Sequence, residues 1–72
     1  MNVDDDVLIK HGLLRGCEGI LAGVINIDDT PVYRVRLTDV TSDAASKGYR
    51  LGDEVDMDRY ELQVKEIPQD GK

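Results

Sequence analysis

The chain is 72 residues long, which is the size of one small domain. Its formal net charge of -6 disfavours nucleic-acid binding through phosphates, because that binding gains affinity from basic side chains that displace counterions. The single cysteine excludes an internal disulfide, and no apolar run is long enough to span a bilayer. We therefore expect one domain in a reducing cytoplasm, with no membrane partner and no export signal.

The amino-terminal half carries two apolar segments, residues 7–9 and residues 19–27, joined by a loop with several glycines. Three aspartates precede the first segment, and β-branched residues dominate the end of the second. Gly19 and Gly23 would each cost about 1 kcal/mol inside a helix, so a strand is favoured for residues 19–27. A glycine within a strand is typical of a bulge or bend, and we expect one at Gly23.

A turn and a third strand follow. Asp28 and Asp29 indicate the turn, because aspartate hydrogen-bonds to its own downstream backbone and Pro31 then fixes the local backbone angle. Residues 32–37 alternate between apolar and polar positions. This pattern predicts a strand with Tyr33 and two aliphatic residues facing the core and the arginines facing water.

The carboxyl-terminal half begins with a long loop, residues 38–52, in which the apolar alternation disappears. Loops of this length in compact domains tend to be functional. Ser42 is expected to cap a short helix within it, because an acid follows the serine and a lysine and a glycine end the segment. Alternation returns in two short strands, residues 53–57 and 62–67, with one turn of 3-10 helix at residues 58–60 between them.

These five strands predict an all-β fold: a small five-stranded barrel with one long loop that contains a short helix. The chain has no Phe and no Trp, so its core must be built from Val, Ile and Leu, with three tyrosines at the edges. Residues 1–5 are expected to be a disordered acidic segment and residues 6–67 the single barrel domain. Residues 68–72 are expected to be a disordered tail.

The first half also resembles a known motif. The residues that carry the likeness are Val7, Ile9, Lys10, Gly12, Arg15, Gly16, Gly19 and Leu21, followed by a β-branched run that ends at Ile27. In this arrangement the segment resembles the KOW motif of ribosomal and transcription-elongation proteins. The resemblance implies a small barrel of the Src-homology type, in which the glycine-bearing loop after the first strand approaches RNA or protein. The acidic charge and the longer segment 38–52 depart from the typical ribosomal members.

The candidate contact residues lie in the first loop, on the third strand and in the long loop. Two adjacent leucines at a loop tip cannot both point into a barrel from a tight turn. We expect at least one either to be exposed, where it would offer a docking point for a protein, or to cover an end of the barrel. Two arginines on one strand face would clamp a phosphate or carboxylate, unless acids across the sheet pair with them. The candidate partner-binding residues are His11, Leu13, Leu14, Arg15, Arg34, Arg36, Tyr49 and Arg50.

Two other constellations lack the full pattern of a chemical site. Cys17 and His11 are close enough in sequence for an activated thiolate, yet no third orienting group or oxyanion donor accompanies them. The aspartates at 4–6 and 28–29 do not have the spacing of a calcium loop. We therefore expect no enzyme, no metal site, no cofactor and no small-molecule substrate.

Three functions stay open, and a protein partner is preferred. The first is a non-enzymatic binding module, an adaptor or regulatory subunit that docks on a protein of a larger assembly, where a basic surface would suit the acidic chain. The second is RNA binding in the KOW manner through a small basic patch. The third is an acidic inhibitor that imitates nucleic-acid phosphates and blocks a basic groove, with the carboxylates of Asp53, Glu54, Asp56, Asp58 and Glu61.

Overall fold

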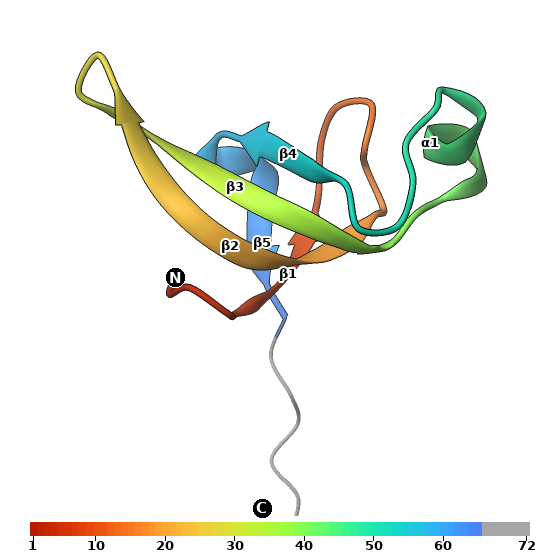
Figure 1. Ribbon diagram of the computed structural model, residues 1–72, viewed down its shortest axis with the longest axis horizontal. Coiled ribbons are helices and arrows are strands. Elements are labelled where there is room, and N and C mark those ends of the chain that lie inside the picture. Colours follow the sequence, from red (N-terminus) through yellow and green to blue (C-terminus); the bar gives the residue numbers. More distant parts are fainter. Residues whose placement is uncertain (66–72) are drawn as a thin grey trace, which may run out of the picture.

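The computed structural model describes residues 1–65, which form one five-stranded sheet (Figure 1). The strands lie in the order β4-β3-β2-β1-β5, and every neighbouring pair is antiparallel. The predicted all-β class is confirmed. In chain order the elements are β1 (Asp6–Ile9), β2 (Glu18–Ile27), β3 (Thr30–Asp39), α1 (Ser42–Ser46), β4 (Glu54–Met57), the 3-10 helix η1 (Arg59–Glu61) and β5 (Leu62–Val64).

The sheet is strongly curved but does not close into a barrel, so this part of the sequence prediction is wrong (Figure 1). Closure requires a ladder between the two edge strands, β4 and β5, and none joins them within residues 1–65. The chain passes from β4 through η1 directly into β5. The three residues of β5 pair with β1 along one edge, and the other edge of β5 is not joined to β4 within residues 1–65.

Two glycines let β2 bend and approach β3 closely. The register between the two strands shifts between Glu18 and Gly19 and again between Leu21 and Gly23, which confirms the irregularity predicted at Gly23. A Cβ added to Gly19 would collide with the side chain of Val35 on β3. The contact between the two strands therefore depends on the absence of a side chain at Gly19.

The short helix α1 lies in the predicted loop but has a different cap. Thr41, and not Ser42, is the N-cap, and its hydroxyl oxygen accepts a hydrogen bond of 3.1 Å from the backbone N–H of Ala44. Ala44 is the buried residue of this helix and belongs to the core. The helix therefore ties the long loop to the end of the sheet.

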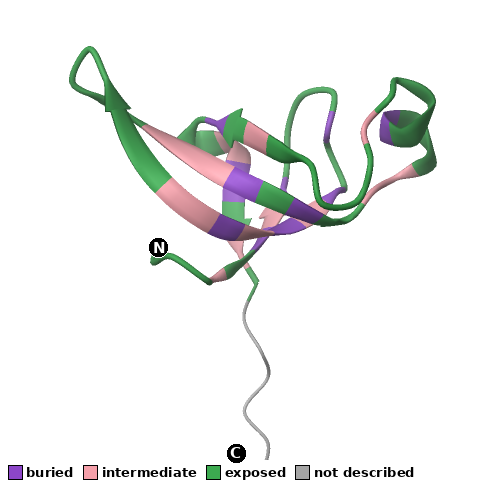
Figure 2. Ribbon diagram, in the orientation of Figure 1, coloured by how far each residue is buried: buried purple, intermediate pink, exposed green. Residues whose placement is uncertain are grey.

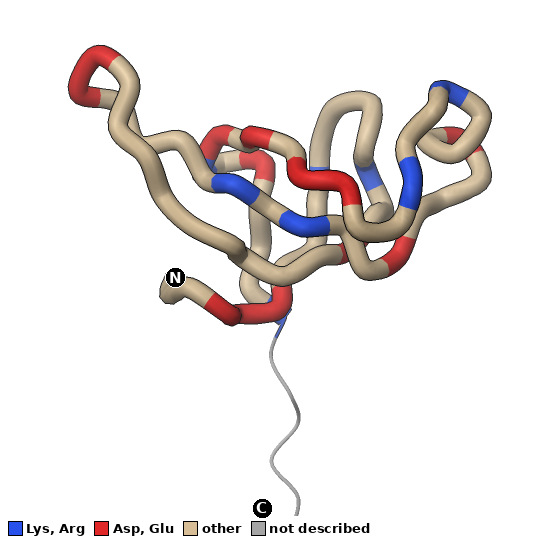
Figure 3. Tube along the Cα trace, viewed as in Figure 1, with Lys and Arg blue, Asp and Glu red and all other residues tan. Residues whose placement is uncertain are grey.

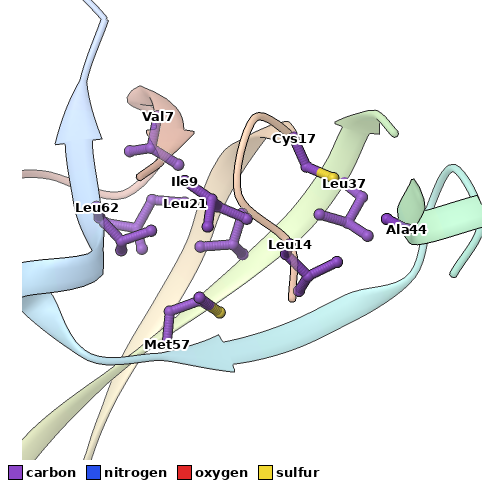
Figure 4. Close-up of a cluster of buried hydrophobic side chains, with 10 residues drawn as sticks. Val7, Ile9, Leu14, Cys17, Leu21, Leu37, Ala44, Met57 and Leu62 are labelled. Atoms are coloured by element: carbon purple, nitrogen blue, oxygen red, sulfur yellow. The ribbon is translucent and has the colours of Figure 1, made fainter. Parts of the chain in front are cut away.

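The core is aliphatic, as the composition predicts, and it draws on both the strands and the first loop. Figure 4 shows Leu14 reaching from that loop toward Leu37 of β3. Tyr33 is partly buried and packs against the cluster, as its place in the alternation predicts. The buried members are Val7, Ile9, Leu14, Cys17, Leu21, Val35, Leu37, Ala44, Met57 and Leu62.

The structure describes the amino-terminal segment fully but the carboxyl-terminal segment only as far as residue 65. At the amino end, where disorder is expected, the backbone N–H of Asp4 donates a 2.8 Å hydrogen bond to the carbonyl oxygen of Leu21, and Met1 packs against the core. At the other end β5 finishes at Val64. The predicted continuation of the last strand to residue 67 and the tail 68–72 lie outside the described residues.

Candidate binding cleft

The loop between β1 and β2, residues 10–17, turns one leucine outward and the next inward. Its ends are tied by the N–H of Ile9, which donates to the carbonyl of Cys17 at 2.9 Å, and the N–H of Gly16, which donates to the carbonyl of Ile9 at 2.8 Å. Leu13 is 63% exposed, whereas Leu14 is only 5% exposed. This confirms that the two leucines cannot both be core residues, and it makes Leu13 the exposed one.

An open cleft of about 360 Å³ lies beside this loop. That volume is at the lower end of the range for ligand sites, roughly 300–1,000 Å³. Of the candidate contact residues, the cleft brings together His11, Leu13, Leu14 and Tyr49. Its complete lining is His11, Gly12, Leu13, Leu14, Tyr49, Val55, Asp56, Met57 and Glu61.

The polar groups of the cleft gather near η1. The Oε1 atom of Glu61 accepts the backbone N–H of Asp58 at 3.0 Å, which restrains the carboxylate. Gly12 has a φ of 85°, a backbone conformation that favours glycine. A Cβ at this position would also stand only 3.4 Å from Oε2 of Glu61. The rings of His11 and Tyr60 lie 6.0 Å apart between centroids. The cleft thus has apolar walls with a carboxylate and aromatic groups at its margin.

The two arginines of β3 do not take part in the cleft. They alternate with the buried Val35, so they lie on the opposite face of the sheet. Arg34 Nε donates to Asp56 Oδ1 at 3.0 Å across β3 and β4, and this hydrogen bond, together with the carboxylate charge, raises the pKa of Arg34. Arg36 lies opposite Glu54 in the same ladder. Asp56 also borders the cleft, but its carboxylate is engaged by Arg34.

The remaining candidates, Arg15 and Arg50, are exposed and do not line the cleft. The backbone N–H of Arg15 donates to the carbonyl of Gly12 at 3.1 Å within the first loop. The backbone N–H of Arg50 donates to Oδ2 of Asp53 at 3.0 Å, which closes a turn before β4. Figure 3 shows basic positions interspersed with acidic ones rather than gathered in one patch.

Cys17 and His11 have different surroundings. Cys17 is fully buried, and its sulfur accepts the backbone N–H of Thr41 at 3.5 Å, with the Thr41 hydroxyl 3.8 Å away. His11 is exposed and faces Tyr60.

Within residues 1–65 no group of three or more His, Cys, Asp or Glu side chains is arranged to hold a metal ion. In that same part of the chain, no helix has both the length and the apolar character needed to cross a membrane.

Sequence reasoning did not include Val55, Met57 and Glu61 among the contact residues. The alternation of β4 assigned Val55 and Met57 to the interior, and Met57 is indeed buried while Val55 is half-buried. At the open edge of the sheet such inward residues also line the cleft. The spacing of Asp58 and Glu61 is a capping pattern, which is the one sequence signal that could have placed Glu61 beside a helix start.

Comparisons with known proteins found no significant match. No family model matches the chain, and no curated protein or solved structure matches it significantly. The likeness to the KOW motif therefore stays a prediction from the residues that carry it.

Proposed function

We propose that the chain is a non-enzymatic binding module, an adaptor or regulatory subunit, which docks on a protein partner through the cleft beside the β1–β2 loop. The observation that carries the proposal is Leu13, a largely exposed leucine at the lip of a cleft with partly apolar walls. Exposed apolar side chains beside a hollow are typical of sites where proteins associate. The KOW resemblance supports the same surface, because the contact segment of that family is the loop after the first strand.

The lining of the cleft indicates the chemistry of the partner. Leu14, Val55 and Met57 provide apolar walls that suit an aliphatic side chain. Glu61 at the margin and the net charge of -6 favour a basic residue beside that side chain. The partner segment would therefore present an aliphatic residue next to a lysine or arginine. A protein of the reducing cytoplasm is the natural source, since the chain carries one thiol and no disulfide.

The charge pairing on β3 and β4 lowers the support for the two alternatives. RNA binding needs arginines that are free to meet phosphates, whereas Arg34 is paired with Asp56 and Arg36 lies opposite Glu54. Imitation of nucleic acid needs a free row of carboxylates, and the ion pair of Arg34 with Asp56 neutralises part of that row. The protein-binding proposal requires neither.

Selection of peptides from a random display library on the immobilised chain, followed by ¹H–¹⁵N titration with a selected peptide, tests the proposal. We expect selected sequences to combine an aliphatic and a basic residue, and the amide shifts to concentrate at Leu13, Val55 and Met57. Leu13→Asp should weaken binding by at least about tenfold, because it places a charge where apolar contact is needed. The matched control is Leu51→Asp, since Leu51 is 67% exposed and does not line the cleft.

Two results would contradict the proposal. One is equal loss of binding in the Leu13 and Leu51 variants, which would show that general surface hydrophobicity is responsible. The other is a saturable shift of Arg34, Arg36 and Tyr49 by a single-stranded RNA at physiological salt, with no peptide selected. That second outcome would favour the RNA-binding alternative.

A further inference from the structure

The hairpin of β2 and β3 extends beyond the rest of the sheet as an arm (Figure 1). Asp28 and Asp29 form its two-residue turn, with φ of 50° and 63° and with Ile27 opposite Thr30. Large apolar side chains are exposed on this arm, and Figure 2 shows its end coloured as exposed. The exposed fractions are 45% for Val24, 39% for Ile25 and 52% for Ile27.

The outer edge of β2 along this arm has no partner strand within the described residues. The ladder with β1 ends at Ile20, and hydrogen bonds with Asp4 and Asp5 extend the contact only as far as Leu21. Beyond that point, no backbone hydrogen bond joins the outer edge of residues 22–27 to any other part of residues 1–65. These residues therefore offer a free strand edge.

The register of the hairpin shows which peptide groups point outward. Residues opposite each other in an antiparallel pair alternate between exchanging hydrogen bonds and not exchanging them. Pro31 lies opposite Asn26 and has no N–H, so this pair does not exchange hydrogen bonds. The N–H and C=O groups of Asn26, and of Val24 two residues earlier, consequently face away from β3.

The two edges of the arm are protected unequally. On the β3 side, Pro31 removes a donor, which is a common way to prevent strand addition. On the β2 side, residues 22–27 contain no charged residue and no proline. A strand edge that lacks both protections and carries apolar side chains on both faces is a template for another strand.

Charges at the two ends of this edge indicate what the added strand must be. Asp28 and Asp29 lie at the tip, and Asp4 is hydrogen-bonded to Leu21 at the inner end. A second copy pairing antiparallel along residues 22–27 would bring the acidic tip of one chain to the acidic segment of the other. Like charges in such positions oppose pairing, whereas a strand with a basic residue at each end would be attracted.

We propose that the outer edge of β2 over residues 22–27 accepts an extended segment of a partner protein as an added strand, with aliphatic residues in its middle and a basic residue at each end. This surface is distinct from the cleft. The hydrogen bonds would come from the backbone of Val24 and Asn26, and the aliphatic residues would cover Val24 on one face and Ile25 and Ile27 on the other.

Hydrogen exchange on the full chain tests the proposal. The probe is a short peptide with valines in its middle, which point to both faces of a strand, and a lysine at each end, and the comparison peptide has glutamates in place of the lysines. At saturation, we expect the lysine peptide to slow exchange of the Val24 and Asn26 amides by about tenfold or more. The amides of Ile25 and Ile27 already face β3 and should change little. The glutamate peptide should leave all four unchanged.

A substitution at Asn26 provides the second test. Asn26→Pro removes an outward N–H at a position of the same kind as Pro31 and should abolish binding of the lysine peptide, whereas Asn26→Ser keeps the N–H and should bind it. Leu13→Asp should also bind it, which separates this proposal from the cleft. Unchanged exchange at Val24 and Asn26, or equal effects of the two peptides, would overturn the proposal. Protection that rises with protein concentration alone would identify a second copy as the occupant and overturn it as well.

Discussion

Gly19 and Arg36 lie so close together that a Cβ on the glycine would stand 2.5 Å from the carbonyl oxygen of the arginine. The contact joins the first residues of β2 to β3, beside the buried side chains of Val35 and Leu37. It explains why a strand that otherwise favours β-branched residues carries a glycine at this point.

Gly19→Ala is therefore expected to destabilise the fold by about 1–3 kcal/mol, because the added methyl group must push β3 away. Urea unfolding followed by circular dichroism measures the change. Gly23→Ala is the matched control, since a Cβ there meets nothing within 4 Å, and it should be neutral or stabilise the fold by up to about 1 kcal/mol. Equal destabilisation by both substitutions would contradict the close approach of Gly19 to β3.

Leu13 and Leu14 are adjacent in sequence but have opposite roles. Leu14→Ala should lower the free energy of unfolding by about 2–5 kcal/mol, because it leaves a cavity beside Leu37. Leu13→Ala should change it by less than about 0.5 kcal/mol, since that side chain is largely exposed. Thermal and urea unfolding of both variants measure the difference. A large loss of stability in the Leu13 variant would show that it is a core residue and would remove the basis of the proposed docking point.

The cap of α1 distinguishes two neighbouring hydroxyl residues. Thr41→Ala removes the acceptor of the Ala44 N–H and should lower the free energy of unfolding by about 0.5–2 kcal/mol. Ser42 is exposed, so Ser42→Ala should have a much smaller effect. Urea unfolding measures both, and the reverse order would show that the serine, as the sequence suggested, is the cap.

Burial of Cys17 predicts slow thiol chemistry. With Ellman's reagent, the native chain should react at least about 100-fold more slowly than the chain unfolded in urea, because the sulfur becomes accessible only when the loop or the whole domain opens. Absorbance of the released thionitrobenzoate reports both rates. Rapid reaction of the folded chain would show an accessible thiol and would reopen the question of a reactive site with His11.

Most local features of this chain could be inferred from the order of its residues. Alternation located the strands, the cost of glycine in helices identified β2, and the absence of Phe and Trp required an aliphatic core. The adjacent residues Leu13 and Leu14 indicated that both could not point into the core from one tight turn. Each of these inferences uses a property of a few neighbouring residues, which is why no knowledge of the fold was needed.

The way in which distant segments meet is visible only in the folded chain. The sheet stays open because no ladder joins its edge strands β4 and β5 within residues 1–65, and strand count alone cannot show whether such a ladder forms. Arg34 meets Asp56 through the register of β3 and β4, which decides between the two possibilities that the sequence offered, a ligand clamp and an ion pair across the sheet. The cleft exists because Glu61 and Tyr49 come to the first loop from far along the chain. Register and long-range contact depend on the packing of the whole domain, and local pattern does not contain them.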